Sequence, residues 1–294
     1  MKKTTQLRNI LAGDQVLLAP FTYDAFAARI GEEVGFSSIY MSGFGVSMSK
    51  GVPDIGLLTQ TEMIENATYI VQSVNVPVIA DADTAYGNPL NVWRTVRDYE
   101  RSGVAGIHIE DQVAPKKCGF FEGKDVISKE EGVQKIRAAV DAKTDSDFVI
   151  IARSDALVVN GWEDTAERCR AYYEAGADLV FVDGIQGIKD LETLLKNNPE
   201  VGKNSKAIKF LVNEYLSSAN IKSACDKTSF IDKSIQNDYL DKFIVYCLIN
   251  NDRKNEAQLI FDLLKERGLE DKFFENKINF LLGFTDNTSE KIID

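Results

Sequence analysis

Histidine and cysteine are scarce in this sequence, which limits the metal and redox chemistry that it can support. Its 294 residues include one histidine, His108, and four cysteines. Cys118, Cys169, Cys225 and Cys247 show neither C-x-x-C pairing nor the spacing of a zinc site. The simplest interpretation is a reduced protein of the cytoplasm, because disulfide frameworks belong to oxidising compartments.

Positive charge, long apolar runs and nucleotide motifs are also lacking. Lysine and arginine total 34 against 45 aspartates and glutamates, which gives a formal charge of −11. This balance argues against nucleic acid or an anionic membrane as the main partner, since both attract clustered basic residues. No segment approaches the roughly 18 apolar residues of a membrane span, and no signal-peptide-like run follows the basic N-terminus. No Walker loop or strand-following G-x-G-x-x-G supports nucleotide chemistry. The expected partner is a small molecule.

Apolar runs that alternate with amphipathic segments are the main feature of residues 7 to 198. The predicted strands are Val16–Pro20, Ser38–Met41, Val78–Ala80, Gly106–Ile109, Phe148–Ala152 and Leu179–Val182. The predicted helices are Tyr23–Val34, Thr61–Val74, Pro89–Ser102, Lys129–Ala142, Thr165–Ala175 and Ile188–Lys196. Gly103 and Gly176 mark helix ends, because glycine readily adopts the left-handed cap conformation. Repeated strand–helix units predict an α/β fold with a parallel sheet, an incomplete TIM-type (β/α) barrel of six units.

The character of the chain changes after residue 199. Only 3 of the 20 glycines and none of the 6 prolines lie in the last 95 positions, where Asn, Lys, Ser and Ile recur with helical periodicity. Lys209–Val212 is repeated as Lys242–Val245, an offset of 33 residues that fits stacked helical hairpins. We therefore predict a barrel domain at 1–199 and a helical hairpin domain of unknown role at 200–294. In the alternative interpretation, Phe210–Asn213 is a seventh barrel strand.

Acidic residues follow two neighbouring apolar runs. The first run leads into Asp81-Ala82-Asp83 and the second into Glu110-Asp111. Alternation along a strand points Asp81 and Asp83 to the same side. Oxygen ligands of this kind suit a hard cation such as Mg²⁺, with Mn²⁺ as the alternative, because it holds few carboxylates and keeps waters. Asp-x-Asp alone is more often a turn or a helix cap, so the metal interpretation depends on the second acidic pair.

A Lys-Lys-Cys-Gly segment, Lys116–Gly119, follows the second acidic pair. An isolated cysteine is more often an inert packing residue. Here two lysines precede Cys118 and a glycine follows it, and we predict a loop thiol that faces the metal site. His108 lies on the opposite side of its strand from Ile107 and Ile109, so it either faces the site or has a hydrogen-bonded role in the core.

Seven motifs resemble the isocitrate lyase and phosphoenolpyruvate mutase superfamily, specifically its methylisocitrate lyase-like branch, which cleaves carbon–carbon bonds. They are Leu18–Ala25, Tyr40–Gly45, Pro53–Gly56, Asp81–Gly87, His108–Gln112, Lys116–Gly119 and Ala152–Ala156. The lyases resemble one another in carrying K-[KR]-C-G in the loop where the phosphonate mutases lack the cysteine. The resemblance implies a small di- or tricarboxylate substrate and a homo-oligomer.

The resemblance also implies a role for each matching residue. Mg²⁺ would be held by Asp81, Asp83 and Glu110, partly through water, with Asp54 nearby. The residues expected to bind the substrate are Tyr40, Ser42, Gly43, Phe44, Gly119 and Asp183. The residues expected to be catalytic are Cys118, Lys116, Arg153 and Glu110. Ser42, Gly43 and Phe44 would cradle a carboxylate through a hydroxyl and backbone N–H groups.

The implied reaction is a retro-aldol cleavage of a 2-methylisocitrate- or alkylmalate-like 2-hydroxy acid to a 2-oxo acid and a carboxylate. The metal would favour the alkoxide, and Cys118 would protonate the enolate that leaves. Lys116 and Lys117 are expected to lower the pKa of Cys118. Gly119 would let the loop fold over the substrate. Decarboxylation of oxaloacetate is a neighbouring alternative within the family.

Three departures from the family pattern affect this picture. Phe120 stands where the lyases commonly have histidine, which excludes a loop imidazole and favours a more apolar substrate. Asp183 replaces the usual glutamate at the end of the sixth strand. No match to the seventh and eighth strands or to the exchanged helix is found, so six strands would leave two open edges. An alternative from another class is therefore an inactive truncated or fused barrel whose helical tail binds a protein partner.

Overall fold

The computed structural model describes residues 1–13, 16–185, 238–268 and 271–282. The chain divides into two compact units, Met1–Gln186 and Gly187–Asp294. The predicted domain boundary at residue 199 and the predicted helix Ile188–Lys196 lie outside the described residues. In the described part of the chain, no helix is long and apolar enough to cross a membrane.

A six-stranded parallel sheet forms the centre of the first unit, with its strands hydrogen-bonded in chain order from β1 to β6. The strands are β1 (Phe21–Thr22), β2 (Ile39–Met41), β3 (Val78–Asp81), β4 (Gly106–Glu110), β5 (Val149–Ser154) and β6 (Leu179–Val182). Because all the strands run the same way, their carboxyl ends meet at one edge of the sheet, where ligands of such folds bind. This confirms the predicted α/β fold with a TIM-type arrangement.

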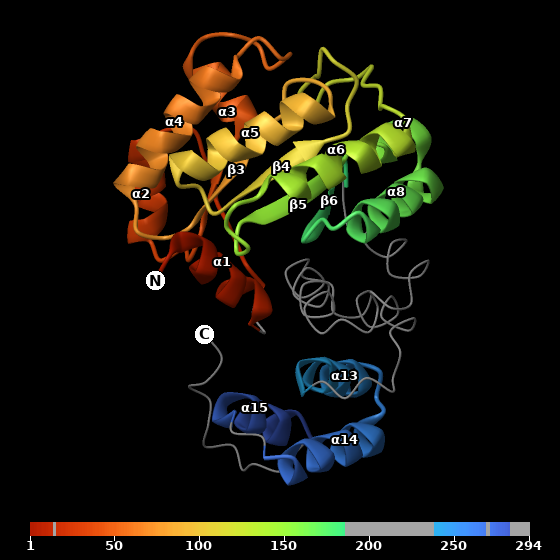
Figure 1. Ribbon diagram of the computed structural model, residues 1–294. Helices are drawn as coiled ribbons and strands as arrows, with labels where there is room; N and C mark the ends of the chain where they lie inside the picture. The colour runs from red at the N-terminus through yellow and green to blue at the C-terminus, as the bar shows by residue number, and fades with distance from the viewer. Residues whose placement is uncertain (14–15, 186–237, 269–270, 283–294) are drawn as a thin grey trace. The chain divides into compact units, whose positions relative to one another are not determined.

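Helices that connect the strands cover the outer face of the sheet (Figure 1). The helices of this unit are α1 (Lys3–Ala12), α2 (Ala25–Glu33), α3 (Gly43–Ser49), α4 (Gln60–Ser73), α5 (Pro89–Ser102), α6 (Lys129–Ala142), α7 (Leu157–Asn160) and α8 (Trp162–Glu174). Helix α1 precedes β1, and its Leu7 packs with Ile79, Val149 and Ile151 in a separate core cluster. The bounds of α5 follow from local sequence. The Asn88 side chain accepts from the first-turn amides, Pro89 occupies the first position, and Gly103 ends the helix with φ of 87°. Gly176 ends the fifth predicted unit, also with a positive φ, of 104°.

The main core lies between the sheet and these helices. Ile70, Val96, Ile107 and Phe148 in it have no exposed surface. Burying a side chain of this size contributes about 2 kcal/mol to folding. The runs in β3, β4 and β5 are buried on both faces, since the helices cover one face and the inside of the sheet the other. That is why these strands read as continuous apolar runs in the sequence.

The prediction for the first strand was wrong. Residues 16–20 are not in a strand, and β1 is the two-residue segment that follows them. It pairs only through Phe21 with Tyr40 and through Thr22 with Met41. The other five predicted strands are confirmed to within two residues at either end. Helices α1, α3 and α7 were not predicted, because their short segments have weak apolar periodicity.

Three helices form the described part of the second unit: α13 (Asp238–Asn250), α14 (Lys254–Glu266) and α15 (Lys272–Leu282). Their shared core includes Val245, Phe261 and Ile278, all without exposed surface. The helical prediction is confirmed for Lys242–Val245, whereas its earlier copy and the alternative strand Phe210–Asn213 lie outside the described residues.

Two of the four cysteines, Cys118 and Cys169, carry free thiols, whereas Cys247 is disulfide-bonded. The expectation of reduced cysteines therefore does not hold for Cys247.

Candidate active site

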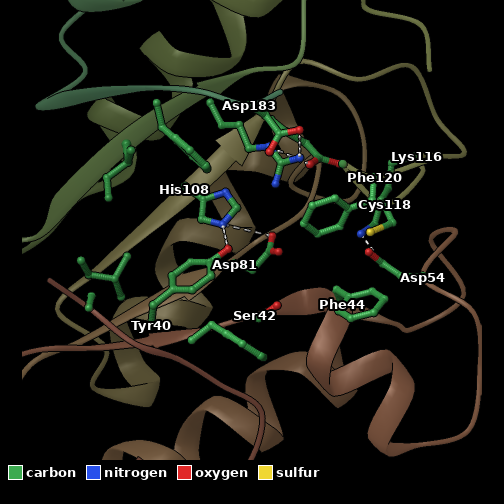
Figure 2. A pocket seen from close by; sticks show the side chains of 18 of the residues that line it. Tyr40, Ser42, Phe44, Asp54, Asp81, His108, Lys116, Cys118, Phe120 and Asp183 are labelled. Carbon is green, nitrogen blue, oxygen red and sulfur yellow. Dashed lines mark hydrogen bonds and ion pairs between the residues drawn. The ribbon is translucent and has the colours of Figure 1, made fainter. Parts of the chain in front are cut away.

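A cavity of about 640 Å³ opens at the carboxyl ends of the strands (Figure 2). All six strands or the residues directly after them contribute side chains to its wall, and the segment Lys116–Phe120 covers one side. Most of the predicted site residues line it. They are Tyr40, Ser42, Phe44, Asp54, Asp81, Glu110, Lys116, Cys118, Gly119, Arg153 and Asp183. Gly43 and Asp83 lie next to Asp81 and complete the predicted set.

Asp81 is held in place by two backbone N–H groups. Its Oδ2 accepts from the Gly43 N–H at 3.0 Å, and its Oδ1 accepts from the Asp83 N–H at 2.9 Å. Burial alone would raise the pKa of Asp81, but His108, Lys116, Arg153 and the Asp83 amide lower it to about 2. Asp81 is therefore ionised throughout the physiological range.

The predicted carboxylate cradle is partly occupied by the protein itself. Ser42 is the N-cap of α3, and its hydroxyl oxygen accepts from the Gly45 N–H at 3.3 Å. The Gly43 N–H donates to Asp81 rather than facing an open position. A β-carbon at Gly43 would lie 2.7 Å from Asp81 Oδ2. The absence of a side chain at Gly43 therefore allows the close approach of Asp81.

Substituting Gly43 with alanine is expected to force Asp81 out of its place, because the added methyl group overlaps Oδ2. We expect a loss of about 1–3 kcal/mol in the free energy of unfolding. Denaturant titration measures it, with Gly13→Ala as the control, because a β-carbon there meets nothing closer than 3.4 Å. A Gly43→Ala variant as stable as Gly13→Ala would contradict the close packing of Asp81 against Gly43.

A second buried cluster joins Asp83, Lys116 and Asp54. The ammonium group of Lys116 lies 2.7 Å from Asp83 Oδ1 and forms an ion pair with Asp54. Burial alone would lower the pKa of Lys116, but the surrounding carboxylates raise it. Burial and the charge of Asp81 raise the pKa of Asp83 to about 6. Even with Lys116 beside it, Asp83 thus resists ionisation next to the ionised Asp81, and a further cation would favour its charged form.

Glu110 supplies the strongest sign of an additional cation. It is buried, and its Oε1 has no hydrogen-bond partner among the residues that the structure describes. Burial raises its pKa well above the usual range, and the charges of Asp155, Asp81 and Asp83 add to the effect. A buried carboxylate oxygen without a partner costs free energy that a bound cation would recover.

The donor set fits Mg²⁺ bound partly through water. Among the described residues, no three His, Cys, Asp or Glu side chains are close enough to form a direct metal cage. Mg²⁺ takes one or two protein carboxylates and retains several waters, so Asp81, Asp83 and Glu110 need not all touch it. The predicted mixed direct and water-mediated binding of Mg²⁺ stays a prediction.

His108 has a site contact that the sequence left undecided. Its Nε2 shares a hydrogen bond of 2.6 Å with the Tyr40 hydroxyl and lies 3.5 Å from Asp81 Oδ1. Burial lowers the pKa of His108 despite the opposing charge of Asp81, so the ring is neutral at pH 7. The register that pairs Asp81 with His108 across β3 and β4 explains the contact. Figure 2 shows Tyr40, His108 and Asp81 joined on one side of the cavity.

Arg153, at the end of β5, lies among three carboxylates. Its guanidinium donates to both oxygens of Asp155 at 2.9 and 3.0 Å, and it lies 3.5 Å from Glu110 and 3.4 Å from Asp183. Asp155 is fully buried, and in the sequence it belongs to the motif Ala152–Ala156 that also contains Arg153. Because Asp155 holds the Arg153 guanidinium through two hydrogen bonds, the remaining N–H groups of the guanidinium point in a fixed direction.

Asp111 holds this arrangement from the side away from the cavity. Its carboxylate accepts from the Ser154 hydroxyl at 2.8 Å and from the Asp155 amide at 2.9 Å. The Tyr172 hydroxyl donates to it at 2.9 Å from α8. The sequence grouped Asp111 with the metal site, whereas the structure gives it the role of positioning the end of β5.

Cys118 differs from its prediction in one important property. Its side chain is buried, its N–H donates to the Asp54 carbonyl at 2.9 Å, and burial raises the pKa of the thiol. The predicted lowering of this pKa was wrong. The charge of Lys116 is engaged by Asp54 and Asp83, and the Lys117 ammonium donates to the Gly123 carbonyl at 2.5 Å. Cys118 is therefore a protonated thiol at neutral pH.

Aromatic rings make the remaining wall of the cavity. Phe120, which stands in place of the expected histidine, is 91% exposed, and its ring lies beside Cys118 facing the cavity (Figure 2). Phe44 and Phe181 line other parts of the wall. The Phe181 ring also lies 5.6 Å from the Arg153 guanidinium. The cavity therefore combines charged groups at the strand ends with a substantial apolar surface.

A comparison with protein families shows to which family this chain belongs. Residues 7–223 match the phosphoenolpyruvate phosphomutase family. The chain belongs to the phosphoenolpyruvate mutase/isocitrate lyase superfamily. The match continues past the predicted boundary at residue 199, so family sequence extends into the region that we assigned to the helical domain.

Two relatives illustrate the likeness. A 2,3-dimethylmalate lyase from Eubacterium barkeri is 46% identical over 200 residues, which cover 68% of this chain and 69% of the relative. A 2-methylisocitrate lyase from Aeropyrum pernix is 43% identical over 205 residues, covering 67% of this chain and 66% of the relative. The matched part thus spans about two thirds of these lyases.

Solved structures give the same result. A 2,3-dimethylmalate lyase, described as a member of the superfamily, superposes with a TM-score of 0.65 and 33% identity, over 88% of this chain and 96% of that one. A phosphonopyruvate hydrolase in complex with oxalate and Mg²⁺ superposes with a TM-score of 0.62 and 25% identity, over 92% of this chain and 100% of that one. Members of the superfamily therefore bind Mg²⁺ and small carboxylates, and the named relatives are enzymes.

Proposed function

We propose that this protein is a Mg²⁺-dependent carbon–carbon lyase that cleaves an alkyl-substituted 2-hydroxy dicarboxylate to a 2-oxo acid and a carboxylate. The observation that carries the proposal is the buried, protonated Cys118 thiol on a loop above the carboxylates at the strand ends. Retro-aldol cleavage leaves a carboxylate enolate that needs a proton on carbon. A thiol whose pKa is raised retains the proton that this step requires.

Different residues of the cavity carry out different steps of such a cleavage. The outward edge of the Arg153 guanidinium binds the substrate oxygens on which negative charge grows. The hydroxyl proton leaves to a neighbouring acceptor, for which the Tyr40–His108 pair is placed in the cavity wall. Cys118 donates the Sγ proton to the enolate carbon. The Lys116–Gly119 segment excludes water from this carbanion-like species.

Mg²⁺ would be held by Asp81, Asp83 and Glu110, partly through water. When bound, it supplies a Lewis acid that favours the substrate alkoxide. The Mg²⁺ complex of the phosphonopyruvate hydrolase supports this assignment. The unpartnered oxygen of Glu110 and the raised pKa of Asp83 support it independently, because both show carboxylates short of positive charge.

An alkylmalate-like substrate fits the cavity better than a tricarboxylate. In the described cavity wall, Lys116 is paired with Asp54 and Asp83, and Arg153 contacts three carboxylates. These partners leave little positive charge on Lys116 and Arg153 for a third substrate carboxylate. Phe120, by contrast, places an aromatic ring where the lyases commonly have histidine, which suits an alkyl group. The similarity to 2,3-dimethylmalate lyase agrees with this choice.

The test is turnover of the full-length protein with Mg²⁺ on a panel of acids. The panel contains 2,3-dimethylmalate, 2-methylisocitrate, isocitrate and oxaloacetate, and the readout is 2-oxo acid formed or consumed. We expect the highest kcat/KM with the dialkylated dicarboxylate. Preference for oxaloacetate would favour the neighbouring decarboxylase, and no turnover with any acid would refute the proposal. Oxalate binding with and without Mg²⁺ separates an inactive protein from one whose site is not assembled.

Mg²⁺ binding is expected to weaken at acidic pH, because protons compete for the carboxylate whose pKa is raised. Asp83 has a pKa of about 6 in the metal-free protein and binds the cation in its ionised form, so affinity should fall about tenfold for each pH unit below 6. Above that value protonation of Asp83 no longer limits the affinity, and any remaining slope reports Glu110, whose pKa is also raised. Isothermal titration with MgCl₂ between pH 5 and 8 measures this. A flat profile would show that Asp83 does not contribute.

A further inference from the structure

Lys124 is a buried lysine that ties the loop to the ends of two strands. Only 2% of its side chain is exposed. Its ammonium group donates to Asp155 Oδ1 at 3.1 Å, to Asp183 Oδ2 at 3.1 Å and to the Gly119 carbonyl at 2.8 Å. Asp155 follows β5 and Asp183 follows β6, whereas Gly119 belongs to the loop that carries Cys118. One side chain thus uses all three of its donors on three separate segments.

The two carboxylates that Lys124 binds are also partners of Arg153. Asp155 accepts two bonds from the guanidinium, and Asp183 lies 3.4 Å from it. With Glu110 at 3.5 Å, Arg153 alone would face three carboxyl groups. Lys124 supplies the second positive charge of this cluster. Asp155 is accordingly held in its ionised form, since burial would raise its pKa but the charges of Arg153 and Lys124 lower it.

The loop is seated on the same carboxylates at the residue next to the thiol. A β-carbon at Gly119 would lie 2.5 Å from Asp183 Oδ2, so the backbone of Gly119 packs directly against that side chain. Gln112 adds a second tie from the start of the loop, because its amide donates to Asp155 Oδ1 at 3.1 Å and to the Lys117 carbonyl at 2.9 Å. Lys124 closes the arrangement from the far end of the loop, where the Phe120 to Gly123 stretch is exposed.

We propose that Lys124 is a positioning residue that holds the Cys118 loop on Asp155 and Asp183, the carboxylates that also orient Arg153. It acts through the Gly119 carbonyl, which keeps the neighbouring thiol buried, and it touches neither the substrate nor the metal. The proposal rests on the proposed function for its catalytic meaning. The position of the thiol can be measured without any substrate.

The test is the rate at which iodoacetamide alkylates Cys118 in the full-length protein, followed at the Cys118 peptide by mass spectrometry. In the wild type only 3% of Cys118 is exposed, so alkylation is slow. We expect Lys124→Met to accelerate it at least about tenfold, because a loop freed from ionic hydrogen bonds opens more often. Loss of a positive charge would by itself raise the thiol pKa and slow the reaction, so acceleration reports exposure.

Two further variants distinguish positioning from general damage. Lys124→Arg, which keeps the charge and the donors, should restore a rate near wild type. Lys117→Met removes the same charge from the same loop but breaks only a bond to the Gly123 carbonyl, and should not accelerate alkylation. Unchanged alkylation in Lys124→Met, or equal acceleration in Lys117→Met, would overturn the proposal.

Asp183→Asn tests the same contact from the sheet side if Lys124→Met does not fold. It removes the charge that Lys124 binds at a side chain that is 20% exposed, and it should also accelerate alkylation. An unchanged rate in this variant would overturn the proposal equally. If a substrate is found, Lys124→Met should lower kcat more than it raises KM, and Lys124→Arg should recover it. The alkylation rate tests the position of Cys118 even if none of the acids in the panel is a substrate.

Discussion

Replacing Cys118 with serine is expected to lower kcat by about 10²–10⁴-fold with little change in KM, as for the loss of a general acid. The two side chains have nearly the same size, so the loop should keep its conformation. A serine hydroxyl is a far weaker acid than a thiol and delivers a proton to the enolate carbon poorly. Formation of the 2-oxo acid under saturating substrate and Mg²⁺ measures the effect.

The matched control for this prediction is Cys169→Ser. Cys169 is also a free thiol with a raised pKa, of about 11, but it lies on α8 and does not line the cavity. Its substitution should leave kcat within about twofold, since surface or partly buried changes of this size alter stability only slightly. Equal activities of the wild type and Cys118→Ser would remove the thiol from the proposed mechanism.

Replacing Arg153 with lysine is expected to lower kcat/KM by about 10²–10³-fold, the usual effect of removing a donor to a developing negative charge. The charge remains, but a lysine cannot donate to both oxygens of Asp155 and keep an edge for the substrate. The fold should persist, because Lys124 and Gln112 still donate to the buried Asp155. Steady-state kinetics and thermal unfolding of the same preparation separate the two effects.

The control for the arginine prediction is Arg101→Lys. The Arg101 side chain is 73% exposed and pairs with Asp98 on the surface of α5. The same chemical change at Arg101 should therefore leave kcat/KM unchanged. A variant Arg153→Lys that retains more than about a third of wild-type kcat/KM would show that charge alone suffices and that the bidentate geometry of Arg153 has no catalytic value.

Much of the site could be predicted because it depends on order along the chain. Asp81, Asp83 and Glu110 follow buried apolar runs, and a parallel sheet brings the ends of such runs to one edge. Cys118 was found for a similar reason, since a loop that follows β4 must begin at that edge. The first strand was misplaced because Val16–Pro20 has the composition of a strand, whereas only the two residues after it pair with β2.

Properties that depend on desolvation could not be predicted in this way. Two lysines beside Cys118 suggested a lowered thiol pKa, but one lysine is engaged by carboxylates and the thiol is buried, so the pKa rises. The Gly43 N–H looked available for a substrate, and the fold directs it to Asp81. Lys124 carried no signal at all in the sequence, because its three partners come together only when the loop reaches the ends of β5 and β6.

The sequence by itself determined the parallel strand–helix order, the family, the carboxylates at the strand ends and the loop thiol, because these are properties of residue type and spacing. The tertiary structure alone decided which charges are already paired, which protons are retained and which groups remain for a ligand. The physical reason is that pairing and desolvation depend on distances between segments far apart in the chain, such as Lys116 and Asp54 or Lys124 and Asp183.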